Sequence, residues 1–366
     1  MSKSFGIVGA GPAALSMACH LSLLGNRVAI YTPFKHEVDR LNSWGAVRSS
    51  GAIETVAKPA FVTGDIEQLV SFAEAIFVLV PAHCHRDVAV AMAPYVKPLQ
   101  LVMLMPGRTG GSLEFMTLLG RQGVVAYPTI GEAQTVLHTC RMDFDRQLVR
   151  ILAVKKTLMI ATLPADRVSG AIEYLSPSFP QLSPAADTLI TGLSNIGAIL
   201  HPAPTLLNFA RIEARMPFHY YREGITPSVA RFLERLDEER CAVANALGAT
   251  VPSIHQWLHD AYGTEPASLY EMLQVTEYYS TILGPTTVEH RYFLEDVPTG
   301  LVPLSELGKA VGVSTTRADM VIELAGKLLK RDFREDGRNL HVLGLIGKSK
   351  EEIVNTFRSG PSRTGI

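Results

Sequence analysis

The sequence lacks closely spaced cysteines, a long apolar run and an excess of charge of either sign. Its 4 cysteines are scattered, which excludes the paired spacings of zinc and redox sites, so we expect reduced, packed thiols and no metal. The apolar stretches at 75–80 and 101–105 are far shorter than the roughly 20 residues that cross a bilayer. Lys and Arg number 34 against 35 Asp and Glu, which disfavours nucleic acid or an anionic membrane as a partner. A small-molecule substrate is the remaining expectation.

The N-terminal residues and the length of the chain bear on the cellular location and the number of domains. Residue 5 already opens an apolar segment, with no basic region and apolar core of a signal peptide before it, so we expect a cytoplasmic protein. At 366 residues, 47% hydrophobic and 19% charged, the chain has enough material for two globular domains.

The first half of the chain alternates strand-like and helical segments. Residues 5–8 are predicted as a strand, 12–24 as a helix that stops at Gly25-Asn26, and 27–31 as a second strand. Further strands are predicted at 75–80, 101–105, 123–127 and 156–162. This alternation indicates an α/β domain with a doubly wound, mostly parallel sheet.

Beyond about residue 180, strand-like runs give way to segments with helical periodicity. Helices are predicted at 229–247, 253–261, 268–279, 304–311 and 317–330. We therefore expect domains at 1–182 and 183–366, the second of them all-α. The segment 176–184, rich in proline and serine, is predicted as the hinge, although its composition suits a surface loop equally well.

A glycine-rich turn joins the first predicted strand to the first helix. Residues 9–14 read Gly-Ala-Gly-Pro-Ala-Ala and fit G-x-G-x-x-G/A, the dinucleotide-binding fingerprint of Rossmann domains. Gly9 permits a tight turn, and Gly11 lets the backbone approach a pyrophosphate that the helix N-terminus then binds. The predicted cofactor-binding residues of this turn are Gly9, Ala10, Gly11, Pro12 and Ala13.

The ends of two other strands bear on the identity of the cofactor. The second strand lacks the terminal carboxylate of NAD-preferring sites, and Thr32, Lys35 and His36 are candidates for binding a 2′-phosphate. This modestly favours NADPH over NADH; the alternative is that Lys35 and His36 are solvated loop residues. Val80 and Pro81 are also predicted to contact the cofactor, because ligands of such sheets bind outside the carboxyl ends of the strands.

Two segments of the second half carry reactive side chains. One is 195–213, which contains His201, and the other is 290–303, which contains Arg291 and Asp296. Taken alone, a histidine in an apolar run is more often a core residue than a catalyst.

Taken together with other motifs, these two segments make the chain resemble the opine dehydrogenase family. This is the octopine/nopaline type, which includes N-(1-carboxyethyl)amino acid dehydrogenases. The resemblance covers nearly the whole chain, and its motifs are the N-terminal fingerprint, 195–204, 218–227, 291–303, 337–340 and 343–345. It implies an NAD(P)H-dependent enzyme that joins an L-amino acid to a 2-oxo acid, commonly pyruvate, and reduces the resulting imine. A larger amine, such as the precursor of an opine metallophore, is the other possible amine.

The resemblance also implies roles for single residues. The family's catalytic histidine falls on His201, its partner aspartate on Asp296, and the arginine that binds the oxo-acid carboxylate on Arg291. These roles suit the side chains: a near-neutral imidazole transfers protons, a carboxylate orients it, and a guanidinium fork matches a carboxylate. The resemblance further implies an active site in the cleft between the domains, and some relatives form a homodimer through the helical domain.

In two places the chain departs from the family pattern. Arg108 stands where many relatives have an amide side chain, and 131–138 lacks the usual Glu-Thr and Leu-Pro elements. Arg108 and Thr135 are therefore predicted to border the substrate, with Arg108 binding a second carboxylate or forming a surface salt bridge. Tyr221 is predicted to line the amino-acid side of the site, with a packing role as the alternative.

Two other functions are consistent with the same residues. One is an amine-independent 2-oxo acid reductase similar to ketopantoate reductase, which would turn over without any amine. The other is a dinucleotide-sensing protein without turnover, in which replacing His201 would change no rate.

Overall fold

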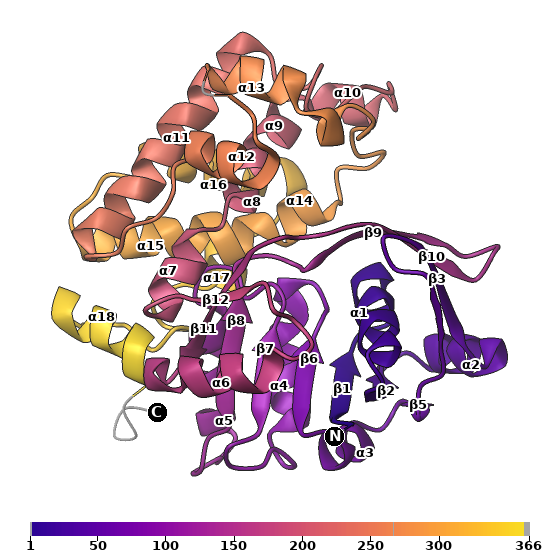
Figure 1. The fold of residues 1–366 in the computed structure, drawn as a ribbon. Coiled ribbons are helices and arrows are strands. Elements are labelled where there is room, and N and C mark those ends of the chain that lie inside the picture. Colours follow the sequence, from indigo (N-terminus) through magenta and orange to yellow (C-terminus); the bar gives the residue numbers. More distant parts are fainter. Residues whose placement is uncertain (1, 266, 362–366) are drawn as a thin grey trace. The chain divides into compact units, whose positions relative to one another are not determined.

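The computed structural model describes residues 2–265 and 267–361, and the chain divides into two compact units (Figure 1). Of the described residues, unit 1 takes 2–107, 111–191 and 355–361, and unit 2 takes 108–110, 192–265 and 267–354. The expected α/β domain followed by a helical domain is confirmed.

Unit 1 is built on a main sheet that has eight strands within the described residues, in the order β12-β11-β8-β7-β6-β1-β2-β5. The strands are β1 (Ser4–Val8), β2 (Arg27–Tyr31), β5 (Phe61–Thr63), β6 (Ala75–Val78), β7 (Leu101–Leu104), β8 (Thr129–Ala133), β11 (Leu158–Leu163) and β12 (Leu182–Pro184). Neighbouring strands are parallel except β8 and β11, which are antiparallel. The strands β1, β6 and β7 are buried throughout, as expected of parallel strands covered on both faces.

The helices of unit 1 follow the strands as in a doubly wound fold. They are α1 (Pro12–Leu23), α2 (Lys35–Trp44), α3 (Ile66–Phe72), η1 (Ala82–Cys84), α4 (His85–Met92), α5 (Gly111–Arg121), η2 (Ala165–Arg167) and α6 (Val168–Leu175). Two more, α7 (Thr188–Leu193) and α18 (Lys350–Ser359), cross the division between the units. The C-terminal part of α18 is fixed to unit 1, because the Thr188 hydroxyl donates to the carbonyl of Phe357 at 2.8 Å.

A second sheet in unit 1 was not expected from the sequence. It has the order β4-β3-β10-β9 and consists of β3 (Val47–Gly51), β4 (Thr55–Ala57), β9 (His138–Asp143) and β10 (Leu148–Val154). Helix α1 lies between this sheet and β1 and β2, contacting strands of both sheets (Figure 1). Only one face is buried, with Val149 and Ile151 in the core and Arg150 between them exposed.

Two sequence predictions for unit 1 need correction. The strand predicted at 123–127 is wrong: Gly123 ends α5 with a positive φ of 86°, and Val125 is exposed. The strand begins instead at β8 (Thr129–Ala133). The segment 176–184 is not a hinge, because Phe179 is buried in the core and β12 pairs with β11. The division into compact units falls after residue 191, and the domain boundary at 182/183 stays a prediction.

Unit 2 is helical. Its elements are α8 (Gly197–Leu200), α9 (Pro202–Leu207), α10 (Phe209–Glu213), α11 (Pro227–Ala246), α12 (Ile254–Tyr262), α13 (Leu269–Val275), η3 (Glu277–Tyr279), α14 (Arg291–Leu294), the π-helical turn η4 (Val297–Leu301), α15 (Val302–Ala310), α16 (Thr316–Leu329) and α17 (Phe333–Asp336). Throughout the described part of the chain, no helix is both long and apolar enough to span a membrane.

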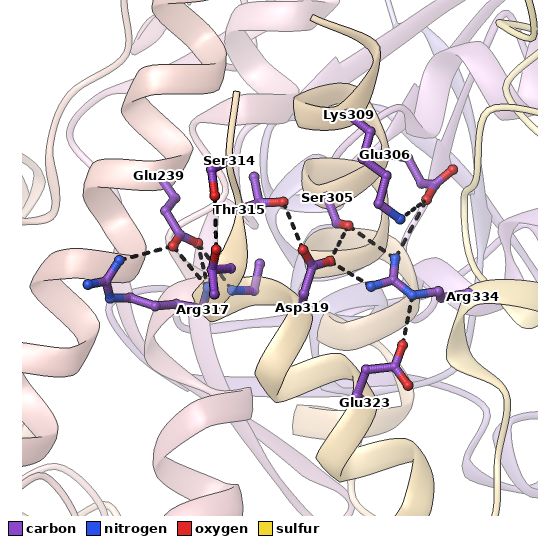
Figure 2. A network of polar contacts seen from close by, with 12 residues as sticks. Glu239, Ser305, Glu306, Lys309, Ser314, Thr315, Arg317, Asp319, Glu323 and Arg334 are labelled. Carbon is purple, nitrogen blue, oxygen red and sulfur yellow. Dashed lines mark hydrogen bonds and ion pairs between the residues drawn. The ribbon is translucent and has the colours of Figure 1, made fainter. Parts of the chain in front are cut away.

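A polar network fixes α16 within unit 2 (Figure 2). Buried Glu239 of α11 accepts hydrogen bonds from the backbone N–H groups of Arg317 and Ala318 at 2.9 and 3.1 Å, which places a carboxylate at the positive end of α16. Arg334 of α17 binds Asp319 at 2.6 Å and Glu323 at 3.0 Å on the same helix. Because α16 also contacts α9 and η4, the network supports the elements that flank His201 and Asp296.

Candidate active site

The turn between β1 and α1 has the geometry of a phosphate-binding turn. Gly9 has φ +123°, and a Cβ there would lie 2.8 Å from the carbonyl oxygen of Leu79, so another residue would be strained and crowded. A Cβ on Gly11 would meet no atom within 4 Å, and Gly11 provides no side-chain cap for α1. The first turn of α1 therefore presents its N–H groups beside open space, and these residues fit a dinucleotide pyrophosphate.

The segments after β2 and β6 border this turn. The Gly9 N–H donates to the carbonyl of Tyr31 at 2.8 Å, and the Val80 side chain lies 3.2 Å from the position of a Gly9 Cβ. Thr32 is buried at the end of β2, whereas Lys35 is exposed and paired with Asp39 at 2.8 Å. Thr32, Lys35 and His36 were predicted to bind a 2′-phosphate. Of these, Thr32 is buried at the strand end, whereas the other two are exposed.

The predicted catalytic pair forms within unit 2. The Nδ1 atom of His201 lies 2.8 Å from Oδ2 of Asp296, whose side chain is fully buried. His201 follows α8 and caps α9, where Pro202 occupies the first helical position, so the break between two short helices sets the place of the imidazole. Asp296 lies between α14 and η4.

Three tyrosines contact His201, two of them at its imidazole and one at its backbone carbonyl. The ring of Tyr292 stacks on it with centroids 4.1 Å apart and planes 14° from parallel. The hydroxyl of Tyr220 donates to the carbonyl of His201 at 2.7 Å, and the hydroxyl of Tyr221 lies 3.4 Å from Nε2. Tyr221 is itself stacked on Tyr279 at 3.9 Å. Tyr221 thus lies near Nε2 and packs on Tyr279, and its predicted place on the amino-acid side of the site stays a prediction.

The surroundings of Asp296 and His201 determine which of the two side chains carries a charge. Burial opposes ionisation of Asp296, yet Arg108, His201 and the hydrogen bond from His201 lower its pKa from 3.8 to about 2. Burial also lowers the pKa of His201 below 6.5, and the opposing attraction of Asp296 compensates only in part. At neutral pH the pair is therefore a carboxylate and a neutral imidazole that donates from Nδ1 and carries its lone pair on Nε2.

Arg108 is a buried member of the same cluster. Its Nε donates to Glu295 at 3.2 Å and its Nη1 to Asn195 at 3.0 Å, while Nη2 lies 3.5 Å from Asp296. Its side chain is only 11% exposed, so Arg108 forms a salt bridge as one alternative predicted, but in the interior and not on the surface. Every nitrogen of the guanidinium faces a protein oxygen, which fits a residue that positions the two carboxylates.

Arg291 is placed differently from Arg108. Its guanidinium lies 5.3 Å from the ring centroid of Tyr292, the ring that stacks on His201, and its side chain is 51% exposed. Its ion pair with Glu295 is long, at 3.6 Å. The predicted carboxylate-binding arginine therefore lies beside the imidazole with much of its fork accessible.

The structure gives the positions of the remaining predicted site residues, but it does not test whether they bind cofactor or substrate. Pro81 precedes η1, and His36 lies in the first turn of α2 with its ring against Phe34 at 5.8 Å. Thr135 lies in the turn after β8 in unit 1 and is half-buried. Their contacts with cofactor or substrate stay predictions, as does the interdomain cleft. Among the residues with described positions, no group of three or more His, Cys, Asp and Glu could hold a metal ion.

The sequence analysis missed the residues that support this cluster. Tyr292 and Glu295 lie in the motif block that contains Arg291, but neither was assigned a role. The spacing of four between Arg291 and Glu295 was the available signal, since it places two side chains on one face of a helical turn. Nothing in the sequence indicated that Arg108 would meet Asn195 and Glu295, because these contacts join distant parts of the chain.

Comparison with known proteins covers both units. The family model for the alpha-helical domain of NAD/NADP octopine/nopaline dehydrogenases matches residues 184–329. The opine dehydrogenase of Arthrobacter sp. (strain 1C) is 41% identical over 94% of this chain and 96% of that protein. Octopine dehydrogenase in complex with NADH and agmatine has a TM-score of 0.80 at 20% identity, covering 96% of this chain and 98% of that one. Yersinopine dehydrogenase bound to NADP+ has a TM-score of 0.73 at 18% identity, covering 98% of each chain.

Proposed function

Since the chain belongs to the opine dehydrogenase family, we propose that it condenses an amine with a 2-oxo acid such as pyruvate and reduces the resulting imine. The enzyme is an NAD(P)-dependent oxidoreductase acting on CH–NH bonds, as its family membership shows. The observation that carries the finer proposal is that His201, paired with Asp296, and Arg291 both lie against the ring of Tyr292. It combines a proton-transferring group with an accessible carboxylate receptor.

The reaction consists of two balanced steps. The amine adds to the carbonyl carbon of the oxo acid and water leaves, which forms a C=N bond. A hydride then adds to that carbon and a proton adds to the nitrogen, giving a secondary amine. When bound at the turn after β1, NAD(P)H supplies this hydride. The protein must bind the oxo acid, move protons during condensation and exclude water during reduction.

His201 handles the protons of condensation. Its Nδ1–H is held by Asp296 at 2.8 Å, so Nε2 is the atom that accepts a proton from the attacking amine and returns it to the departing hydroxyl. Asp296 stabilises the imidazolium that exists between these two transfers. Tyr221, 3.4 Å from Nε2, lies where it can contact the same substrate atoms.

Arg291 binds the carboxylate of the oxo acid. Its fork can form two parallel hydrogen bonds with a carboxylate, a better geometry than the 3.6 Å contact with Glu295 that it now makes. The ring of Tyr292 contacts both groups: it stacks on the imidazole at 4.1 Å, and the guanidinium lies 5.3 Å from its centroid.

The test is a screen of L-amino acids and larger amines against pyruvate and glyoxylate, with NADH and NADPH in parallel. The proposal expects oxidation of the cofactor only when both an amine and an oxo acid are present. Oxidation with oxo acid alone would identify an amine-independent 2-oxo acid reductase. An absence of oxidation with every pair, together with tight cofactor binding, would identify a sensing protein. The cytoplasmic location and a homodimer through the helical domain stay predictions.

A further inference from the structure

Two consecutive carboxylates, Glu295 and Asp296, share one buried cation, Arg108. The Nε of Arg108 donates to Oε1 of Glu295 at 3.2 Å, and its Nη2 lies 3.5 Å from Oδ1 of Asp296. The second oxygen of each carboxylate faces a group of the proposed reaction. Oδ2 of Asp296 lies 2.8 Å from Nδ1 of His201, and Oε2 of Glu295 lies 3.6 Å from Nη1 of Arg291. Through one carboxylate each, Arg108 is therefore linked to both the imidazole and the carboxylate-binding arginine.

The backbone of Arg108 has an unusual conformation that its surroundings fix. Its φ of +61° lies in the left-handed region, which favours glycine. The next residue, Thr109, is bonded through each of its polar groups. Its N–H donates to the carbonyl of Thr299 at 3.2 Å, its hydroxyl donates to the carbonyl of Gly192 at 2.8 Å, and its carbonyl accepts from buried Arg338 at 3.1 Å. Strain of this kind persists only where the surroundings impose it, and it concentrates at functional sites.

The space around the Arg108 side chain is shaped for this ion pairing. A Cβ on Gly197 would lie 2.6 Å from Nη1 of Arg108 and 3.0 Å from Oδ1 of Asp296, so a larger residue there would disturb the pair. Nη1 donates to Asn195 at 3.0 Å. Oδ1 of Asp296 accepts no hydrogen bond from the part of the chain that the structure describes, so its ion pair with Arg108 offsets part of the cost of burying it.

We infer that Arg108 is a positioning residue: by binding Glu295 and Asp296 together, it fixes His201 and Arg291 relative to each other. The inference rests on the proposed function, because it concerns the two reactive groups of that reaction. A guanidinium suits this task, since its planar fork contacts two acceptors in a fixed geometry that a single ammonium does not reproduce. The role differs from the expected binding of a second substrate carboxylate, which becomes an outcome of the test.

The charge of Arg108 also acts on the imidazole. Burial is the main cause that lowers the pKa of His201, Asp296 is the main cause that raises it, and the charges of Arg291 and Arg108 lower it further. Further ionisable side chains around the ring, which the variants below leave unchanged, are His290, Tyr220, Tyr221 and Tyr292. Removing the charge of Arg108 should therefore raise the pKa of His201, whereas a lysine at this position keeps the charge.

The experiment measures the pKa of His201 by NMR, and the steady-state kinetics, in the wild type, Arg108→Gln and Arg108→Lys. The chain has 11 histidines, so with isotope-labelled histidine the His201 resonance is assigned by its absence from His201→Gln. In Arg108→Gln we expect a raised pKa, a higher KM for the oxo acid and a kcat/KM lower by about 10²-fold, the effect of a small misplacement of reacting groups. Arg108→Lys should keep the wild-type pKa but recover only part of kcat/KM, because it lacks the fork.

A matched control separates this role from the general loss of a buried arginine. Arg240 is also a buried arginine of unit 2, and it binds Asp237 at 2.8 Å and the carbonyl of Leu193 at 2.6 Å. Arg240→Gln should lower thermal stability and leave the pKa of His201 unchanged.

Three results would overturn the inference. The first is an unchanged His201 pKa and an unchanged KM for the oxo acid in folded Arg108→Gln. The second is a higher KM for the amino acid alone, which disappears with an amine that lacks the carboxylate, because Arg108 would then bind substrate directly. The third is wild-type kcat/KM in Arg108→Lys, which would show that the fork is not needed; this variant decides the matter if Arg108→Gln does not fold.

The pKa measurement needs no substrate, so the two proposals fail separately. If no amine and oxo acid are turned over, the proposed reaction is wrong, while a His201 pKa raised in Arg108→Gln and restored in Arg108→Lys still supports the link from Arg108 to the pair. If turnover occurs but the Arg108 variants behave as the wild type, the reaction stands and the role of Arg108 is wrong.

Discussion

Replacing Asp296 with asparagine tests how much the catalytic pair contributes. A carboxyl pKa lowered from 3.8 to about 2 despite full burial corresponds to about 2–3 kcal/mol that favours the carboxylate among its cationic neighbours. Asparagine keeps the shape but removes the charge that stabilises the imidazolium of His201. We expect kcat/KM to fall by about 10²–10⁴-fold, with little change in the KM for the oxo acid because Arg291 is untouched.

The pH profile of Asp296→Asn makes the test specific. The neutral imidazole accepts the proton, so kcat/KM of the wild type should fall as pH drops through the pKa of His201, which burial places below 6.5. Asp296 raises that pKa in part, so its loss should move the acidic limb to still lower pH. Glu295→Gln is the matched control, because Glu295 also binds Arg108, at 3.2 Å, and its limb should not move. Near-wild-type rates in Asp296→Asn, or the same limb in all three proteins, would refute the reasoning.

Three more changes probe the substrate site, the acid stability of unit 1 and the framework of unit 2. In Arg291→Lys, loss of the planar fork should raise the KM for the oxo acid by about 10-fold or more and leave cofactor binding unchanged, as steady-state kinetics and titration would show. His138 lies 3.0 Å from His20, and burial and that neighbour lower its pKa to about 3, so the unfolded chain binds the extra proton. Stability should therefore fall as pH drops from 6.5 toward 3, and urea unfolding should show a loss from pH 7 to 5 that is smaller by roughly 2 kcal/mol in His138→Gln. Glu239→Gln removes the charge that caps α16 and should lower stability by about 1–3 kcal/mol in thermal unfolding, an effect that unchanged stability would rule out.

The spacing of apolar residues predicted the buried parallel strands and the long helices. Fully buried strands such as β1 and β6 appear as continuous apolar runs, and α11 has the periodicity of a half-buried helix. The second sheet escaped prediction because its strands bury one face only, and because β3 pairs with β10, a strand about a hundred residues away. The strand predicted at 123–127 shows the converse error, since two adjacent valines after a helix do not make a strand without a neighbour to pair with.

The candidate site divides in the same way. The positions of His201, Asp296 and Arg291 came from motif resemblance. The structure places Asp296 against His201, and it places both His201 and Arg291 beside Tyr292. The contacts of Arg108 with Asn195 and Glu295 depend on how separate segments meet, which the spacing of residues in one sequence does not determine.

The most direct test of the central claim follows the hydride itself. NADH carrying deuterium on the transferred position of C4 is supplied with pyruvate and an amine that supports turnover, and the product is analysed by mass spectrometry and NMR. The account predicts a secondary amine with deuterium on the carbon newly bonded to nitrogen, formed about 10²–10⁴-fold more slowly by His201→Ala. Deuterium recovered in a hydroxy acid, or equal rates for the two proteins, would contradict it.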